Sequence, residues 1–167
     1  MVKRKNKKRK NLDTPLYVED KPKSIASEKI RGIRSNIMFS SANEIKSVLI
    51  TSEKTAAGKS IISANIAISY AQAGYKVLII DGDMRKPTQH YLLETSNYDG
   101  LSNLIIGKSE IDKAIKSTRV DKLDLLTSGP VPPNPSELIA SSNFRKIFAS
   151  LQDCLLYTSD AADDSLR

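Results

Sequence analysis

KSVLITSEKTAAGKSIISANIAISYAQAG, residues 46–74, contains the pattern that decides the fold. Its apolar start, Lys46 to Ser52, has the length of a β-strand, and the small residues from Lys54 to Ser60 indicate a loop. Apolar residues at helical spacing predict a helix from Ser60 to Ala73, which Gly74 ends as a C-terminal cap. A strand, a loop of small residues and a helix in this order predict the phosphate-binding unit of an α/β fold.

The loop carries the groups that a bound phosphate needs. Backbone N–H groups can converge on the oxygens, Lys59 supplies a positive charge, and the Ser60 hydroxyl suits Mg²⁺. Gly58, Lys59 and Ser60 fill the last three positions of the Walker A pattern, whereas Glu53 stands where the first glycine is usual. The pattern favours nucleotide binding, and the alternative is a turn and helix start without a ligand.

A second motif, DGDMRKP, follows the apolar strand predicted over Lys76 to Ile80. Carboxylates at the carboxyl end of a parallel strand point into the ligand crevice. Asp81 and Asp83 could therefore hold Mg²⁺, and one of them could accept a proton from an attacking hydroxyl. The alternative is a polar turn after a strand.

The remaining elements extend the same alternation. A third strand is predicted over Lys122 to Thr127. Helices are predicted at Ser27 to Met38, with Ser27 as the cap, and at Asp99 to Ile106, Glu110 to Lys116, Ser136 to Ala140 and Asn143 to Leu151. Continuous apolar strands that alternate with helices predict a three-layer α/β fold, with helices on both faces of a parallel sheet.

Charge and composition restrict the class of protein. The seven basic residues within residues 1–11 account for the whole formal net charge of +7. We therefore predict a basic disordered arm and linker over residues 1–24, which could be solvated, lie on an anionic membrane or, least favoured, touch nucleic acid. One cysteine excludes an internal disulfide and fits a reducing cytoplasm. No apolar run is long enough for a membrane span.

Several motifs in series resemble the bacterial tyrosine kinases, whose deviant P-loop is paired with an Asp-x-Asp-x-Arg motif called Walker A′. The resemblance runs from about Ser27 to about Leu151. The segments that carry it are KTAAGKS, YKVLIIDGDMRKPTQH, GLSNLIIGK, LDLLTSGPVPPNPSELIAS and the Glu-x-x-Arg-x-x-Arg pattern of Glu28, Arg31 and Arg34. It implies a P-loop NTPase-like fold over residues 25–153.

The resemblance also implies roles for single residues. Lys59 would bind the β- and γ-phosphates of ATP, Ser60 would bind Mg²⁺, and Asp81 and Asp83 would serve as catalytic base or metal ligands. The expected nucleotide contacts are Lys54, Thr55, Ala56, Ala57, Gly58, Lys59, Ser60, Ile61 and Arg85. The residues expected to contact neighbouring subunits of a ring are Glu28, Arg31 and Arg34, for which the alternative is a solvated helix face with ion pairs.

The implied function is an ATP-dependent protein-tyrosine kinase in capsule or exopolysaccharide synthesis. Its expected partners are protein tyrosine substrates and a separate membrane protein whose cytoplasmic tail activates it. This implies a cytoplasmic location at the inner face of the membrane. The alternatives are a partition or Min-type ATPase switch and a non-catalytic nucleotide-binding fragment.

The end of the chain departs from the family pattern. The family shows an apolar strand that ends in Asp, the Walker B element, where this chain has CLLYTSDAADDSLR at residues 154–167. We therefore expect residues 154–167 to be a non-native tail and the fold to be incomplete at the C-terminus. A chain of this length should be inactive and marginally stable, because strand edges would lack neighbours.

Overall fold

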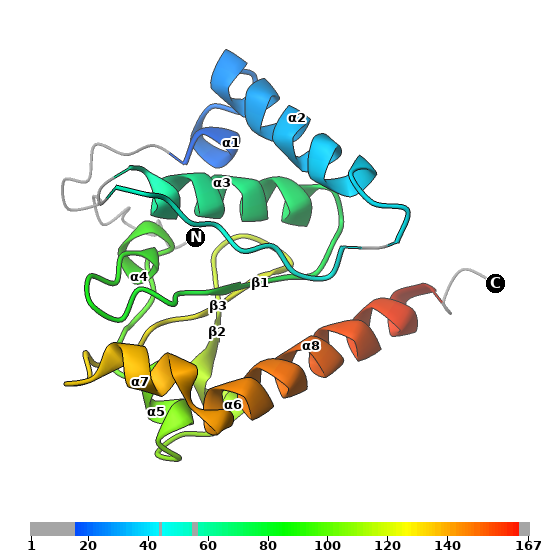
Figure 1. Cartoon of the computed structure of the whole chain (residues 1–167). Coiled ribbons are helices and arrows are strands. Elements are labelled where there is room, and N and C mark those ends of the chain that lie inside the picture. Colours follow the sequence, from blue (N-terminus) through cyan, green and yellow to red (C-terminus); the bar gives the residue numbers. More distant parts are fainter. Residues whose placement is uncertain (1–15, 44, 55–56, 164–167) are drawn as a thin grey trace, which may run out of the picture.

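A computed structural model describes residues 16–43, 45–54 and 57–163, and the side chains of these up to residue 153. Figure 1 shows helices on both sides of a small sheet. In chain order the elements are α1 (Tyr17–Asp20), α2 (Ile25–Phe39), α3 (Lys59–Gln72), β1 (Val77–Ile80), α4 (Gln89–Leu92), α5 (Leu101–Ile105), α6 (Ile111–Ala114), β2 (Ile115–Ser117), β3 (Leu123–Leu126), α7 (Pro135–Ala140) and α8 (Ser142–Asp163).

The sheet has the order β1-β3-β2. β1 and β3 are parallel, with Val77 opposite Leu123, as predicted. β2 is antiparallel to β3, with Ile115 opposite Leu126, so the prediction of a helix through Lys116 and of an all-parallel sheet was wrong here. The reason is the short connection between β2 and β3, since a parallel crossover needs a dozen or more residues.

Two apolar clusters cover the two faces of the sheet, which confirms the predicted three layers. On one face Ile79 of β1 and Leu125 of β3 pack with Ile68 of α3. On the other face Leu126 of β3 packs with residues of α5 and α8, among them Leu101 and Leu151. In Figure 1, α1 to α3 lie on one side of the sheet and α5 to α8 on the other.

The segment Lys46 to Ser52 is not a strand, which corrects the prediction. It takes part in no backbone–backbone hydrogen bond with any described residue. Leu49 is 90% exposed and Val48 is 49% exposed, and only Ile50 packs against the core. A strand forms only where an adjacent strand exchanges backbone hydrogen bonds with it. None of the described strands is hydrogen-bonded to this segment.

The predicted linker contains the short helix α1. The folded part of the chain therefore begins no later than Leu16, and not at residue 25. Leu16 and Val18 are fully buried, and the Val18 N–H donates to the Asn65 side chain of α3 over 3.0 Å. Ser24, and not Ser27, caps α2, because its Oγ accepts the Ser27 N–H. Ser27 is instead buried, and its hydroxyl donates to the backbone carbonyls of Tyr17 and Lys21. The burial of Leu16 and Val18 thus outweighs the preference for an extended conformation that was expected of this linker.

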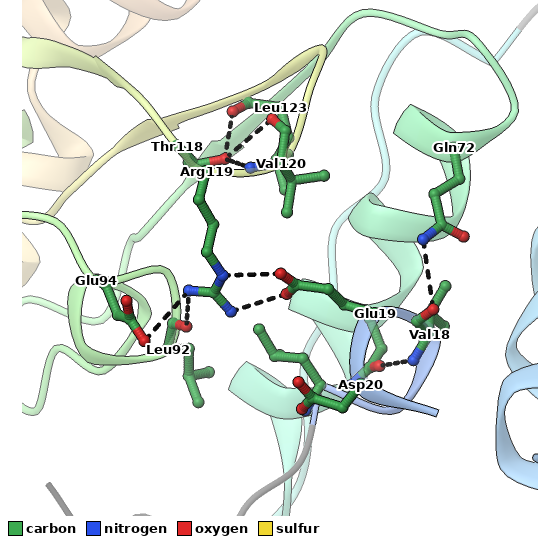
Figure 2. Close-up of polar contacts among 12 residues, drawn as sticks. Val18, Glu19, Asp20, Gln72, Leu92, Glu94, Thr118, Arg119, Val120 and Leu123 are labelled. Carbon is green, nitrogen blue, oxygen red and sulfur yellow. Dashed lines mark hydrogen bonds and ion pairs between the residues drawn. The ribbon is translucent and has the colours of Figure 1, made fainter. Parts of the chain in front are cut away.

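An arginine from the β2–β3 connection holds α1 in place. Figure 2 shows the Arg119 guanidinium between α1 and the chain that follows α4. It makes two hydrogen bonds of 2.8 Å to the Glu19 carboxylate, and it also contacts the Leu92 carbonyl and Glu94. On the far side of α1, the Gln72 amide donates to the Val18 carbonyl. Segments a hundred residues apart are therefore joined at this point.

The last helix, α8, extends beyond the predicted Asn143–Leu151 and continues to Asp163. No Gly or Pro interrupts the chain between these limits, so nothing local ends the helix. Among the helices of the described residues, none combines the length and the apolar character needed to cross a bilayer. Residues 1–15 of the basic arm lie outside the described residues.

Candidate functional site

The phosphate loop ends at Gly58, which adopts a left-handed conformation with φ of 83° at the N-terminus of α3. No side chain caps this 14-residue helix, so its first N–H groups remain available to an anion. No atom of the described residues lies within 4 Å of a Cβ built on Gly58. The backbone angle, and not crowding, is therefore what favours glycine at this position.

Lys59 and Ser60 form the first turn of α3. The Lys59 ammonium donates to the Ser52 hydroxyl at 3.1 Å, and that hydroxyl donates to the Lys54 carbonyl at 2.7 Å. The two ends of the loop are thus tied together. Ile61 packs against the core and offers a nucleotide only its backbone. Of the predicted contacts, Thr55 and Ala56 lie outside the described residues.

Asp81 follows β1 directly and is only 5% exposed. Its carboxylate accepts three backbone N–H groups, from Asp83 at 3.2 Å, Thr88 at 3.2 Å and Gln89 at 3.1 Å. Burial raises the pKa of Asp81, and the three hydrogen bonds oppose this rise because they stabilise the charged form. Asp81 therefore holds the turn from residue 82 to residue 89 together, besides its predicted role in chemistry.

The other two residues of the Asp-x-Asp-x-Arg motif lie at the surface. Asp83 is exposed, and its Oδ1 accepts the Lys86 N–H at 3.0 Å. Arg85 donates to the Ser136 hydroxyl of α7 at 3.2 Å. This bond joins the motif to the proline-rich segment after β3, which the sequence did not predict. Arg85 is thus turned along the protein surface toward α7.

Two residues that sequence reasoning missed, Thr88 and Gln89, connect the two motifs. The Thr88 hydroxyl donates to the Ser60 hydroxyl at 2.6 Å. The buried Gln89 side chain donates to the Ser60 carbonyl at 3.0 Å and to the Ser63 hydroxyl at 2.8 Å. The available signal was a polar pair immediately after Pro87, at a point where the chain must turn back toward the sheet.

The oxygen atoms at this junction fit a magnesium ion. Ser60 and Asp81 contribute a hydroxyl and a carboxylate, the ligands that Mg²⁺ prefers, and both are bonded to Thr88. Asp81 Oδ1 accepts a single hydrogen bond and keeps capacity for another partner. Within the described residues no group of three or more acidic, histidine or cysteine side chains forms a preformed cage. Such a site would match Mg²⁺, which keeps several waters and is shared with phosphates.

The predicted oligomerisation residues of α2 do not act as one surface set. Arg31 pairs with the exposed Glu28 on the same helix and also donates to the Pro22 carbonyl. Arg34 instead turns toward α3, where it donates to the Ser69 carbonyl at 2.6 Å. Glu28 and Arg31 therefore remain accessible to a neighbour, whereas Arg34 already packs two helices of its own chain together.

Comparison with protein families and curated proteins gives a consistent assignment. Residues 45–151 match the AAA domain family. The chain is 70% identical over 145 residues to the putative tyrosine-protein kinase CapB of Staphylococcus aureus, covering 86% of this chain and 64% of that protein. It is 44% identical to the tyrosine-protein kinase YwqD of Bacillus subtilis, covering 81% of this chain and 57% of that protein. The chain thus spans less than two thirds of these relatives.

Solved structures agree with the sequence comparison. The chimerical protein CapA2B2 superposes with a TM-score of 0.78 at 57% identity, over 81% of this chain and 60% of that one. The kinase domain of the Escherichia coli tyrosine kinase ETK also gives a TM-score of 0.78, at 33% identity, over 88% of this chain and 58% of that one.

Proposed function

Because this chain belongs to the AAA domain family and, within it, to the bacterial tyrosine kinases, we propose that its protein transfers the γ-phosphoryl group of ATP to protein tyrosines. One observation carries the proposal. The first turn of α3, with Lys59 and Ser60, is bonded through Thr88 to the carboxylate of Asp81. The groups for binding phosphate and for accepting a proton therefore lie next to each other in the fold.

The roles of the residues follow from their positions. The free N–H groups of α3 and the Lys59 ammonium bind the β- and γ-phosphates and neutralise their charge. Asp81 serves either as the catalytic base that takes the proton from the tyrosine hydroxyl, since burial raises its pKa, or as a ligand of Mg²⁺. Arg85, which donates to Ser136 of α7, would contact the nucleotide.

Members of this family bind nucleotides, generally with Mg²⁺. When bound, Mg²⁺ supplies positive charge that stabilises the transferring phosphoryl group. Ser60 and Asp81 would hold it, with Asp83 in support through water, because Asp83 lies two residues further along the same turn. Lys54 and Ala57 would contact the phosphates from the other side of the loop.

The biological setting is proposed from the relatives' names. Relatives include a putative tyrosine-protein kinase in the cps region of Klebsiella pneumoniae, and CapB of Staphylococcus aureus. We propose a regulatory role in capsule or exopolysaccharide synthesis. The protein would act at the inner face of the membrane through an activator with a cytoplasmic tail, and its substrates would be protein tyrosines.

The test uses the full-length protein with its activator. Lys59→Met should abolish ATP·Mg²⁺ binding by calorimetry and tyrosine labelling by radioactive ATP, because the phosphates lose their cation. Lys108→Met, an exposed lysine after α5, is the control and should leave both unchanged. ATP affinity that is unaltered in Lys59→Met would overturn the phosphate-loop assignment. Hydrolysis of ATP without any phosphotyrosine in the wild type would favour the ATPase switch instead.

The ring assembly needs a variant that does not disturb the fold. Since Arg34 packs against α3, its substitution would confuse assembly with stability. Arg31→Glu should convert the full-length assembly to smaller species by light scattering, and Lys29→Glu on the exposed part of α2 is the control. An unchanged mass for Arg31→Glu would contradict the ring.

A further inference from the structure

The dipeptide Thr88-Gln89 donates five hydrogen bonds, to Asp81, Ser60 and Ser63, all in the candidate site. Both backbone N–H groups donate to the same oxygen, Oδ2 of Asp81, at 3.2 and 3.1 Å. Both side chains reach the other way, to Ser60 and Ser63 in the first turns of α3. The dipeptide is therefore a bridge between the end of β1 and the start of α3.

The hydrogen bonds of this bridge determine which oxygen atoms of Ser60 and Asp81 remain able to bind a cation. Two donors on Oδ2 fix the plane of the Asp81 carboxylate and leave Oδ1 with one bond, to the Asp83 N–H. The Thr88 hydroxyl donates to Ser60, so the Ser60 hydroxyl keeps a lone pair for a cation. Oδ1 of Asp81 and Oγ of Ser60 thereby each keep capacity for a cation.

The side chain of Gln89 is buried with only part of its hydrogen-bonding capacity used. It is 4% exposed, and its Oε1 is buried without a hydrogen-bond partner among the described residues. Its amide group instead donates to Ser60 and Ser63, and those two bonds would be lost with an apolar side chain. The amide orientation is set by the Ser60 carbonyl, which can only accept.

We infer that Thr88 and Gln89 are positioning residues, which hold the Ser60 hydroxyl and the Asp81 carboxylate at the separation that one Mg²⁺–nucleotide complex requires. The inference rests on the proposed function, whose site it deepens. Thr88 links the two ligands directly, and Gln89 fixes the first turn of α3 relative to the same carboxylate. Partners of metal ligands typically change metal affinity by about 10- to 100-fold when they are removed.

The experiment measures how nucleotide binding depends on Mg²⁺ in the full-length protein. ADP is titrated by calorimetry at a series of Mg²⁺ concentrations and in EDTA. Thr88→Val and Gln89→Leu should raise the half-saturating Mg²⁺ concentration about tenfold and leave the affinity in EDTA unchanged. Thr88→Ser keeps the hydroxyl and should restore the wild-type value. In tyrosine labelling, kcat should fall in the same order while KM for ATP at saturating Mg²⁺ changes little.

Matched controls come from the other end of α3 and from the β2–β3 connection. Gln72→Leu removes an amide that donates to the Val18 carbonyl, and Thr118→Val removes a hydroxyl that donates to the Leu123 carbonyl. Gln72 is the last residue of α3 and Thr118 follows β2, so both variants should leave the Mg²⁺ dependence unchanged. Figure 2 shows the contacts that they remove. If Gln89→Leu does not fold, Thr88→Val with its serine rescue still decides.

Three outcomes would overturn the inference. The Thr88 and Gln89 variants could match the controls, Thr88→Ser could be as defective as Thr88→Val, or wild-type binding could be independent of Mg²⁺. A wild-type protein that binds ADP with Mg²⁺ but makes no phosphotyrosine would refute the kinase proposal alone. The Mg²⁺ titration would then still decide the role of Thr88 and Gln89.

Discussion

Two segments with nearly the same sequence pattern have different structures in this chain. KSVLITS at residues 46–52 and KVLII at residues 76–80 are both short, apolar and β-branched, and each is followed by a loop of the candidate site. The second forms β1, bonded along its length to β3. The first is an extended segment without strand pairing, and Leu49 within it is 90% exposed. Local pattern therefore does not distinguish them, and the presence of a neighbouring strand does.

The loops after the two segments differ in the same way. The turn after β1 is held by the Asp81 carboxylate, which accepts three backbone N–H groups. Among its described residues, the loop after Ser52 has the Lys59–Ser52 contact and the bond from Ser52 to the Lys54 carbonyl. Of the described residues, those in the turn after β1 are thus the more strongly braced. This difference predicts at which positions substitutions lower the free energy of unfolding most.

The largest difference in stability between the two segments is expected when a proline is introduced into each. Ile79→Pro lies within the ladder between β1 and β3, where proline removes a donor and disturbs the neighbouring strand, so the free energy of unfolding should fall by about 3 kcal/mol or more. Leu49→Pro should change it by less than about 0.5 kcal/mol, because no backbone bond to a described residue is lost. Urea denaturation of this chain measures both.

The same pair of proline variants in the full-length protein sharpens the comparison. Equal costs there would mean that residues 46–52 become a strand once further chain is present. Equal costs in the present chain would contradict the structure described above.

Side-chain truncation should give the next largest effect. Leu125 in β3 is fully buried, and Leu125→Ala should lower the free energy of unfolding by about 3 kcal/mol through lost burial and a cavity. Leu49→Ala removes the same atoms from an exposed position and should cost less than about 0.5 kcal/mol. Thermal melts of the two variants provide the measurement. Similar shifts would show that Leu49 is covered in solution.

Alanine substitutions of the two aspartates of the DGD motif should differ in their effect on stability. Asp81→Ala leaves three backbone N–H groups without their acceptor and should destabilise the nucleotide-free protein by about 2 kcal/mol. Asp83→Ala loses one exposed bond, to the Lys86 N–H, and should cost less than about 0.5 kcal/mol. Circular dichroism melts without nucleotide compare them. Equal stability of the two variants would refute the bracing role of Asp81.

The smallest effect is expected where α1 is joined to the domain. Arg119 and Glu19 are each about a quarter exposed, and a double-mutant cycle with Arg119→Ala and Glu19→Ala should give a coupling of about 0.5–1 kcal/mol. The exposed pair of Lys113 and Glu110 is the control and should give a coupling near zero. High salt should weaken the first coupling only partly, because about three quarters of each side chain in the bidentate pair is covered.

Much of the fold and of the site was predictable from the sequence. The helix after the phosphate loop, predicted from Ser60, begins at Lys59, and the strands predicted at residues 76–80 and 122–127 are β1 and β3. Continuous apolar runs next to Gly and Asp identify such elements because the signal lies within a few residues. The family assignment rested on several such motifs in series, and the comparisons confirm it.

The bridge of Thr88 and Gln89, by contrast, was not predictable. Threonine and glutamine are common polar residues, and nothing in TQH indicates that one will be buried against α3. The same holds for the bond from Arg34 to Ser69, because the Glu-x-x-Arg-x-x-Arg pattern assigned Arg34 to a subunit contact and gave no sign of a bond within the chain. The assignment of Glu28, Arg31 and Arg34 to a ring remains a prediction.

By itself, then, the sequence determined the order of phosphate loop, helix and strand with an acidic end, since local periodicity and turn chemistry indicate each of them. Tertiary structure alone decided that residues 46–52 stay unpaired with the described strands, that β2 runs antiparallel, and that Val18 and Leu16 fold onto α3. The physical reason is that backbone pairing and burial need a partner. Whether a partner is present depends on residues far away in the chain, which no local pattern records.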